Sequence, residues 1–190
     1  MKQTISLLIL LIASASSFPA EATTSGLDPE LAKVKATHDA GELQESLDQV
    51  DAYLESNPDS ADAHAWKGLV FASLAGESGP FKMVKYGTAA NKSFDRALDI
   101  DPDNAFAHYG VGVAKLFTPK AFGGDVGAAV EHLNQALERS DSDDFSSQIL
   151  TFLAIAFSTN DRPDEAKQCL ERAVELDPAN GAAFDALQNS

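Results

Sequence analysis

The stretch SQILTFLAIAFSTNDRPDEAKQCLERAVELDPAN, from Ser147 to Asn180, decides the fold of this chain. Its first half carries apolar side chains at the spacing of one face of an α-helix, at Leu150, Leu153, Ala154 and Phe157. Its second half repeats that pattern at Ala166, Leu170, Ala173 and Val174. Pro163 suits the first turn of a second helix, and Asp177-Pro178 ends it. The stretch therefore predicts two antiparallel helices joined by a tight turn at Asn160 and Asp161.

One helical pair cannot bury both of its faces, so it needs neighbours in the chain. In length and in the spacing of its apolar and small residues, this stretch resembles a tetratricopeptide repeat, with Leu150 and Ala154 replacing the family's opening tryptophan and glycine. The resemblance implies an all-α fold, a right-handed superhelix of antiparallel helix hairpins, that is, a TPR-like solenoid. Such a scaffold does not by itself identify a ligand or a pathway.

The first 22 residues have the pattern of a cleavable secretory signal peptide. Lys2 precedes an apolar run from Ile5 to Ala13, and Ala20-Glu21-Ala22 fits a cleavage site. An uncleaved anchor is the alternative. No cysteine follows the run, so a lipoprotein signal is not expected. These features predict a periplasmic or secreted protein.

Residues 23–190 are predicted to form one TPR-like domain. Its expected parts are a divergent repeat over 27–60, repeats with inter-helix insertions over 61–102 and 103–141, a regular repeat over 147–180 and a capping helix over 181–190. Aligning 62–74 with 104–116 equates Gly68 with Gly110. We therefore expect Gly110 at the close contact between the two helices of its hairpin.

The two insertions have different predicted structures. Within residues 76–88, Pro80 is expected to begin an N-terminal extension of the following helix. Within residues 118–125, Pro119 ends a helix, Gly123-Gly124 permits a tight turn and Asp125 is a good N-cap. Repeat insertions often lie on a binding side, but they also fill gaps between irregular units. The sequence leaves both roles open.

Composition and motifs argue against most kinds of chemistry. A formal net charge of −15 makes the chain a poor candidate for nucleic acids or anionic membranes. Cys169 is the only cysteine, and none of the four histidines has the spacing of a helical metal site. Asp99-x-Asp101-x-Asp103 lacks the glycine and glutamate of a calcium loop. We expect no enzyme, no cofactor and no metal site.

The remaining functional feature is the concave surface that the resemblance implies. Carried over by repeat register, it would be lined by Ala65, Trp66, Leu69, Ala107, His108, Val111, Lys115, Thr151, Phe152 and Ile155. Lys115 is its only cation, so an acidic peptide tail is not expected there. Trp66, His108 and Phe152 share one repeat position and could form a ladder. Alternatively, tight curvature closes the groove, and these side chains are core.

The leading function is an exported, non-enzymatic interaction module. It would bind a protein partner, as a helix or an extended segment, in the apolar groove. The alternative is a periplasmic carrier or accessory protein that binds a small hydrophobic ligand in the same groove. Neither interpretation includes nucleic acid, or a membrane after signal cleavage.

Overall fold

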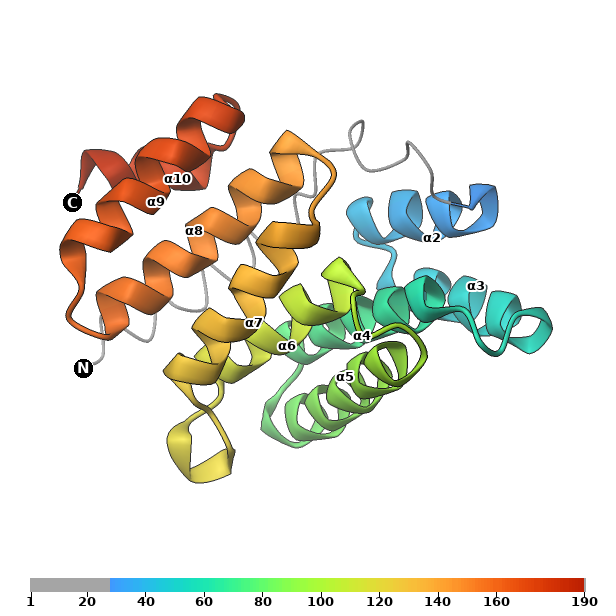
Figure 1. Cartoon of the computed structure of the whole chain (residues 1–190). Helices are drawn as coiled ribbons and strands as arrows, with labels where there is room; N and C mark the ends of the chain where they lie inside the picture. The colour runs from blue at the N-terminus through green and yellow to red at the C-terminus, as the bar shows by residue number, and fades with distance from the viewer. Residues whose placement is uncertain (1–27, 190) are drawn as a thin grey trace. The chain divides into compact units, whose positions relative to one another are not determined.

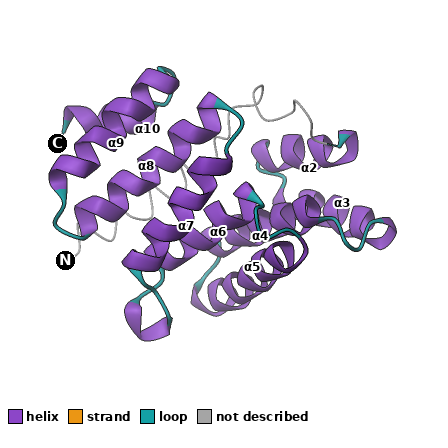
Figure 2. Cartoon of the chain, viewed as in Figure 1, coloured by secondary structure: helices purple, strands orange, loops and turns teal. Residues whose placement is uncertain are grey.

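A computed structural model describes residues 28–189, which contain nine α-helices, a short 3-10 helix and no strand (Figures 1 and 2). The predicted signal peptide lies outside these described residues. No helix in the described part is long and apolar enough to cross a bilayer. The chain forms two compact units, one ending at Pro102 and the other beginning at Asp103.

The first unit consists of two helical hairpins. Its helices are α2 (Pro29–Asp39), α3 (Leu43–Ser56), α4 (Ala61–Gly76) and α5 (Pro80–Ile100). Gly41 turns the chain between α2 and α3 with φ +79°, a conformation that favours glycine. The Ser60 hydroxyl caps α4 by accepting from the Ala63 N–H at 3.3 Å.

From Pro80 onward, the insertion at 76–88 is part of a helix, as the sequence predicted. α5 is 21 residues long, begins with Pro80 in its first turn and continues without a break into the second helix of the hairpin. Tyr86 stacks on Phe71 of α4 with ring centroids 6.1 Å apart, which fixes the extension to its hairpin partner.

The second unit consists of two hairpins and a final short helix. Its helices are α6 (Ala105–Phe117), α7 (Val126–Arg139), α8 (Asp143–Thr159), α9 (Pro163–Leu176) and α10 (Gly181–Gln188). α8 and α9 are the pair predicted from Ser147 to Asn180, with the turn at Asp161, whose φ is +56°, although α8 begins earlier than predicted, at Asp143. α10 packs on α9 and α8, and thereby covers the last hairpin as a capping helix should.

The second insertion is the tight turn that its glycines predicted. Helix α6 ends at Phe117, a 3-10 turn spans Lys120–Phe122, and Gly123 has φ +97°. A Cβ on Gly124 would lie only 1.7 Å from the Thr118 carbonyl oxygen, so only glycine fits there. The Asp125 carboxylate then caps α7 by accepting from the N–H groups of the next turn, at 2.9 and 3.1 Å.

The repeat register predicted for residues 104–116 is wrong by two positions. Gly68 meets the Phe94 ring, where a Cβ would lie 2.4 Å from a ring carbon, but its counterpart in α6 is Gly112. A Cβ on Gly112 would lie 2.7 Å from Leu133 Cγ. Each of these two glycines follows its helix N-cap, Ser60 or Asn104, by eight positions. The caps therefore set the register, and Gly112 rather than Gly110 makes this contact.

Candidate functional site

In the first unit, the residues predicted to line the groove lie in the interior. Ala65 and Trp66 are fully buried, and Leu69 is 7% exposed. The His38 ring lies edge-on to the Trp66 ring with centroids 6.1 Å apart. Trp66 therefore packs beneath α2 in this structure, which matches the core interpretation of these side chains rather than an open wall.

In the second unit, the predicted residues are buried or half-buried. Ala107, His108, Thr151 and Phe152 are buried, whereas Val111, Lys115 and Ile155 are half-buried. The Lys115 ammonium donates to the Gly123 carbonyl oxygen at 3.3 Å, so this cation lies against the second insertion. Whether a partner binds at this set of residues stays a prediction.

Tyr109 is the aromatic residue that the sequence analysis missed in this part of the chain. Its ring makes T-shaped contacts with Phe152 and Phe145, at centroid distances of 5.6 and 5.4 Å. Its phenol is buried, and burial raises its pKa well above the usual value. The two-residue register error explains the omission, because it placed Ala107 rather than Tyr109 at the position equivalent to Thr151.

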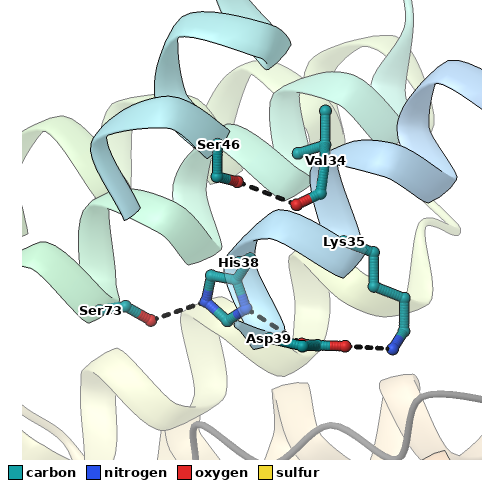
Figure 3. Close-up of polar contacts among 6 residues, drawn as sticks. All are labelled: Val34, Lys35, His38, Asp39, Ser46 and Ser73. Atoms are coloured by element: carbon teal, nitrogen blue, oxygen red, sulfur yellow. Dashed lines mark hydrogen bonds and ion pairs between the residues drawn. The ribbon is translucent and has the colours of Figure 1, made fainter. Parts of the chain in front are cut away.

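A buried polar chain joins α2 to α4 within the first unit (Figure 3). The Lys35 ammonium pairs with Asp39 at 2.6 Å, although the lysine side chain is only 2% exposed. Asp39 Oδ1 lies 3.3 Å from His38 Nδ1, and His38 Nε2 lies 2.9 Å from Ser73 Oγ. Beside this chain, the Ser46 hydroxyl donates to the Val34 carbonyl oxygen at 3.0 Å. These contacts satisfy charged and polar groups that burial would otherwise penalise.

The side chains of Ser73, His38 and Asp39 contact one another in the order of a Ser-His-Asp hydrolase triad. The backbone around Ser73, however, does not suit acyl transfer. Ser73 lies inside α4, where backbone N–H groups donate to carbonyls one turn earlier. An oxyanion hole needs N–H donors that are not already engaged in this way. The arrangement therefore serves to connect two helices rather than to support a nucleophile.

The start of α5 carries the large apolar side chains of the first unit that are exposed to solvent. Phe81 is 95% exposed, Val84 66% and Met83 49%. Lys82 and Lys85 alternate with them, and both are exposed. We call residues 80–88 the α5 extension. It is a surface that the sequence analysis located but did not assign to binding.

Two hollows of the described surface are lined mainly by polar and charged residues. The larger, of about 660 Å³, lies between α2 and α3 and includes Glu30, Lys33 and Gln49. The smaller, of about 320 Å³, borders the second insertion and includes Lys120 and Asp125. A site for a hydrophobic ligand is, by contrast, lined predominantly by apolar and aromatic residues.

Two sequence models described as tetratricopeptide repeat match this chain, one over residues 31–105 and the other over 147–180, together more than half of its length. The chain belongs to the tetratricopeptide repeat (TPR) family. Its helices and structural neighbours show an all-α TPR-like solenoid, a fold that is typically non-catalytic and serves protein–protein interaction. Among curated proteins, none matches this TPR chain.

Solved structures share this TPR fold at low sequence identity. A thermophilic TPR protein of Thermus thermophilus is 18% identical, with 98% of this chain and 93% of that chain covered and a TM-score of 0.68. The structure of pilF of Pseudomonas aeruginosa is 19% identical, with 84% of this chain and 65% of that chain covered and a TM-score of 0.66. The structure of MamA of Desulfovibrio magneticus RS-1 is 16% identical, with 83% of this chain and 79% of that chain covered and a TM-score of 0.57.

Proposed function

We propose that this TPR chain is an exported, non-enzymatic interaction module that captures an acidic, amphipathic segment of a protein partner on the α5 extension. The observation that carries the proposal is the exposure of Phe81, at 95%. An aromatic ring left in water next to a second apolar side chain is a typical anchor for a partner. Export is supported by the signal-like sequence of residues 1–22.

Charge supports the choice of an acidic partner. Residues 78–94 contain three lysines and no aspartate or glutamate, in a chain with 29 acidic residues. Phe81, Val84 and Lys85 have the i, i+3, i+4 spacing of one helical face. A partner helix with alternating apolar and acidic residues would bury the two apolar side chains and pair with the lysine.

The predicted groove remains the second candidate for the binding surface of this module. Its residues are the apolar set around Trp66 and Phe152, which are buried in this structure. A partner that bound there would have to displace side chains that now cover these residues. Binding to the α5 extension requires no such rearrangement, because its apolar side chains are already exposed. The experiment therefore has to compare these two surfaces directly.

A photo-crosslinking residue placed at position 81 in the native host provides the test. Phe122, which is 82% exposed and beside Lys120 in the second insertion, is the matched control position. We expect one acidic protein to crosslink at position 81 and not at position 122. With that protein purified, Phe81→Ser and the double charge reversal Lys82→Glu/Lys85→Glu should each weaken binding at least about tenfold.

Three results would overturn the proposed surface. Crosslinks that are the same at positions 81 and 122 would indicate non-specific contact. A binding loss in Trp66→Phe with none in Phe81→Ser would place the partner in the predicted groove. A small hydrophobic molecule retained by the native protein in mass spectrometry, with no protein crosslink, would favour the carrier alternative.

A further inference from the structure

Two histidines from neighbouring helices of the second unit meet directly. His108 of α6 and His132 of α7 lie with their Nδ1 atoms 3.0 Å apart and their ring centroids 5.2 Å apart. They are 24 residues apart in sequence, which is why spacing within one helix did not reveal them. His108 is 5% exposed, and His132 is half-buried, so the pair lies at the edge of the interior.

The separation of the two nitrogens suits a shared metal ion. Imidazole nitrogens bind such ions at about 2.0–2.1 Å, so two on one ion are about 2.8 Å apart at a right angle and about 3.3 Å apart at a tetrahedral angle. The observed 3.0 Å lies between these values. Rotation of the two rings would direct both Nδ1 atoms at one ion in place of the hydrogen bond between them.

The backbones that carry these two rings are held firmly. His108 lies in the first turn of α6, whose N-cap Asn104 accepts from the Ala107 N–H at 2.9 Å. His132 immediately precedes Leu133, which packs against Gly112, one helical turn after His108. The close approach of the helices therefore sets the distance between the rings, and a site assembled in advance loses little entropy when it binds an ion.

We propose that His108 and His132 form a binding site for a divalent transition-metal ion, with Cu²⁺ bound more tightly than Zn²⁺. The order follows from the general preference of nitrogen ligands for Cu²⁺ over the other divalent ions of its row. In residues 28–189 no group of three or more His, Cys, Asp or Glu side chains could hold a metal ion together, so within these residues the site has two protein ligands. The net charge of −15 raises the local concentration of cations.

Titration calorimetry of the full chain with Cu²⁺, and separately with Zn²⁺, tests the site. His132→Gln is the informative variant, because His132 is the less buried of the pair. His64→Gln is the matched control, since His64 is a half-buried histidine of the first unit whose Nε2 lies 2.9 Å from the Pro58 carbonyl oxygen. We expect one equivalent of Cu²⁺, at least tenfold weaker binding in His132→Gln, and no change in His64→Gln.

A second readout is independent of the heat of binding. Saturating Zn²⁺, chosen because copper oxidises thiols such as Cys169, should raise the urea midpoint of the wild type and His64→Gln but not of His132→Gln. Equal metal affinity in the wild type and His132→Gln would overturn the proposal. So would an equal loss in His64→Gln, which would show that any surface histidine suffices. A circular dichroism spectrum of each variant confirms that it is folded.

Discussion

Gly112 of α6 lies against Leu133 of α7 so closely that a Cβ at position 112 would be 2.7 Å from Leu133 Cγ. Leu133 is fully buried, so its side chain has little room to move away. The same relationship holds between Gly68 and Phe94 in the first unit. In both hairpins a glycine of the first helix packs against a large side chain of the second helix. The missing side chain at the glycine lets the two helix axes approach closely.

Replacement of Gly112 by alanine should therefore destabilise the protein. The added methyl group forces Leu133 out of its position and costs about 1–3 kcal/mol by overpacking. Gly87→Ala is the matched control, because a Cβ there meets nothing within 4 Å and the residue lies inside α5. That change should stabilise by about 0.5–1 kcal/mol through helix propensity. Urea titration measures both, and a stabilised Gly112→Ala would contradict the contact.

The sequence predicted the α8–α9 hairpin well because nothing interrupts its 34-residue period. The register predicted for residues 104–116 was wrong for a specific reason. Gly110 and Gly112 are separated by one residue, and from the sequence either could be the small residue of the contact. The equivalent N-caps, Ser60 and Asn104, held the information that decides between them. Counting from these caps would have placed Gly112 in the contact.

Pairs of residues far apart in the sequence were beyond pattern analysis. His38 and Ser73 are 35 residues apart, and His108 and His132 are 24 apart. Their contacts depend on how helices pack, and that packing is set by crossing geometry rather than by any local period. The burial of Trp66 was likewise open, because an apolar residue on a repeat surface can line a groove or fill a core.

Two ion pairs on α2 have similar short distances but differ in burial. Lys35 and Asp39 are 2.6 Å apart at 2% and 14% exposure, whereas Lys33 and Glu30 are 2.8 Å apart at 65% and 63%. Asp39→Ala removes a charged partner from a buried ammonium and should cost about 1.5–3 kcal/mol. Glu30→Ala should cost at most about 0.5 kcal/mol, because solvent screens the exposed pair.

Urea unfolding at low and high salt measures this difference between the two pairs. Salt should weaken the exposed pair and leave the cost of Asp39→Ala nearly unchanged, since screening acts poorly on buried charges. If both variants lost the same small amount of stability, the buried polar chain of Figure 3 would contribute nothing beyond a surface pair.

The buried phenol of Tyr109 makes stability depend on pH in the alkaline range. Burial raises its pKa in the folded protein above the usual value of about 10, so the folded state keeps the phenolic proton after the unfolded chain has lost it. The ionisation of this group therefore leaves the free energy of unfolding unchanged below about pH 10 and lowers it progressively as the pH rises above that value. Tyr109→Phe cannot ionise and removes this dependence.

Absorbance of tyrosinate and urea unfolding test the same prediction in two ways. The chain has three tyrosines, and we expect one of them to ionise only when the folded protein unfolds at high pH. In Tyr109→Phe this late fraction should disappear, and the urea midpoint should fall less between about pH 9 and 11 than it does in the wild type. If all three tyrosines ionised together in the folded protein, the Tyr109 phenol would be in contact with water. Its contacts with Phe145 and Phe152 would then be at the surface rather than in the interior of the second unit.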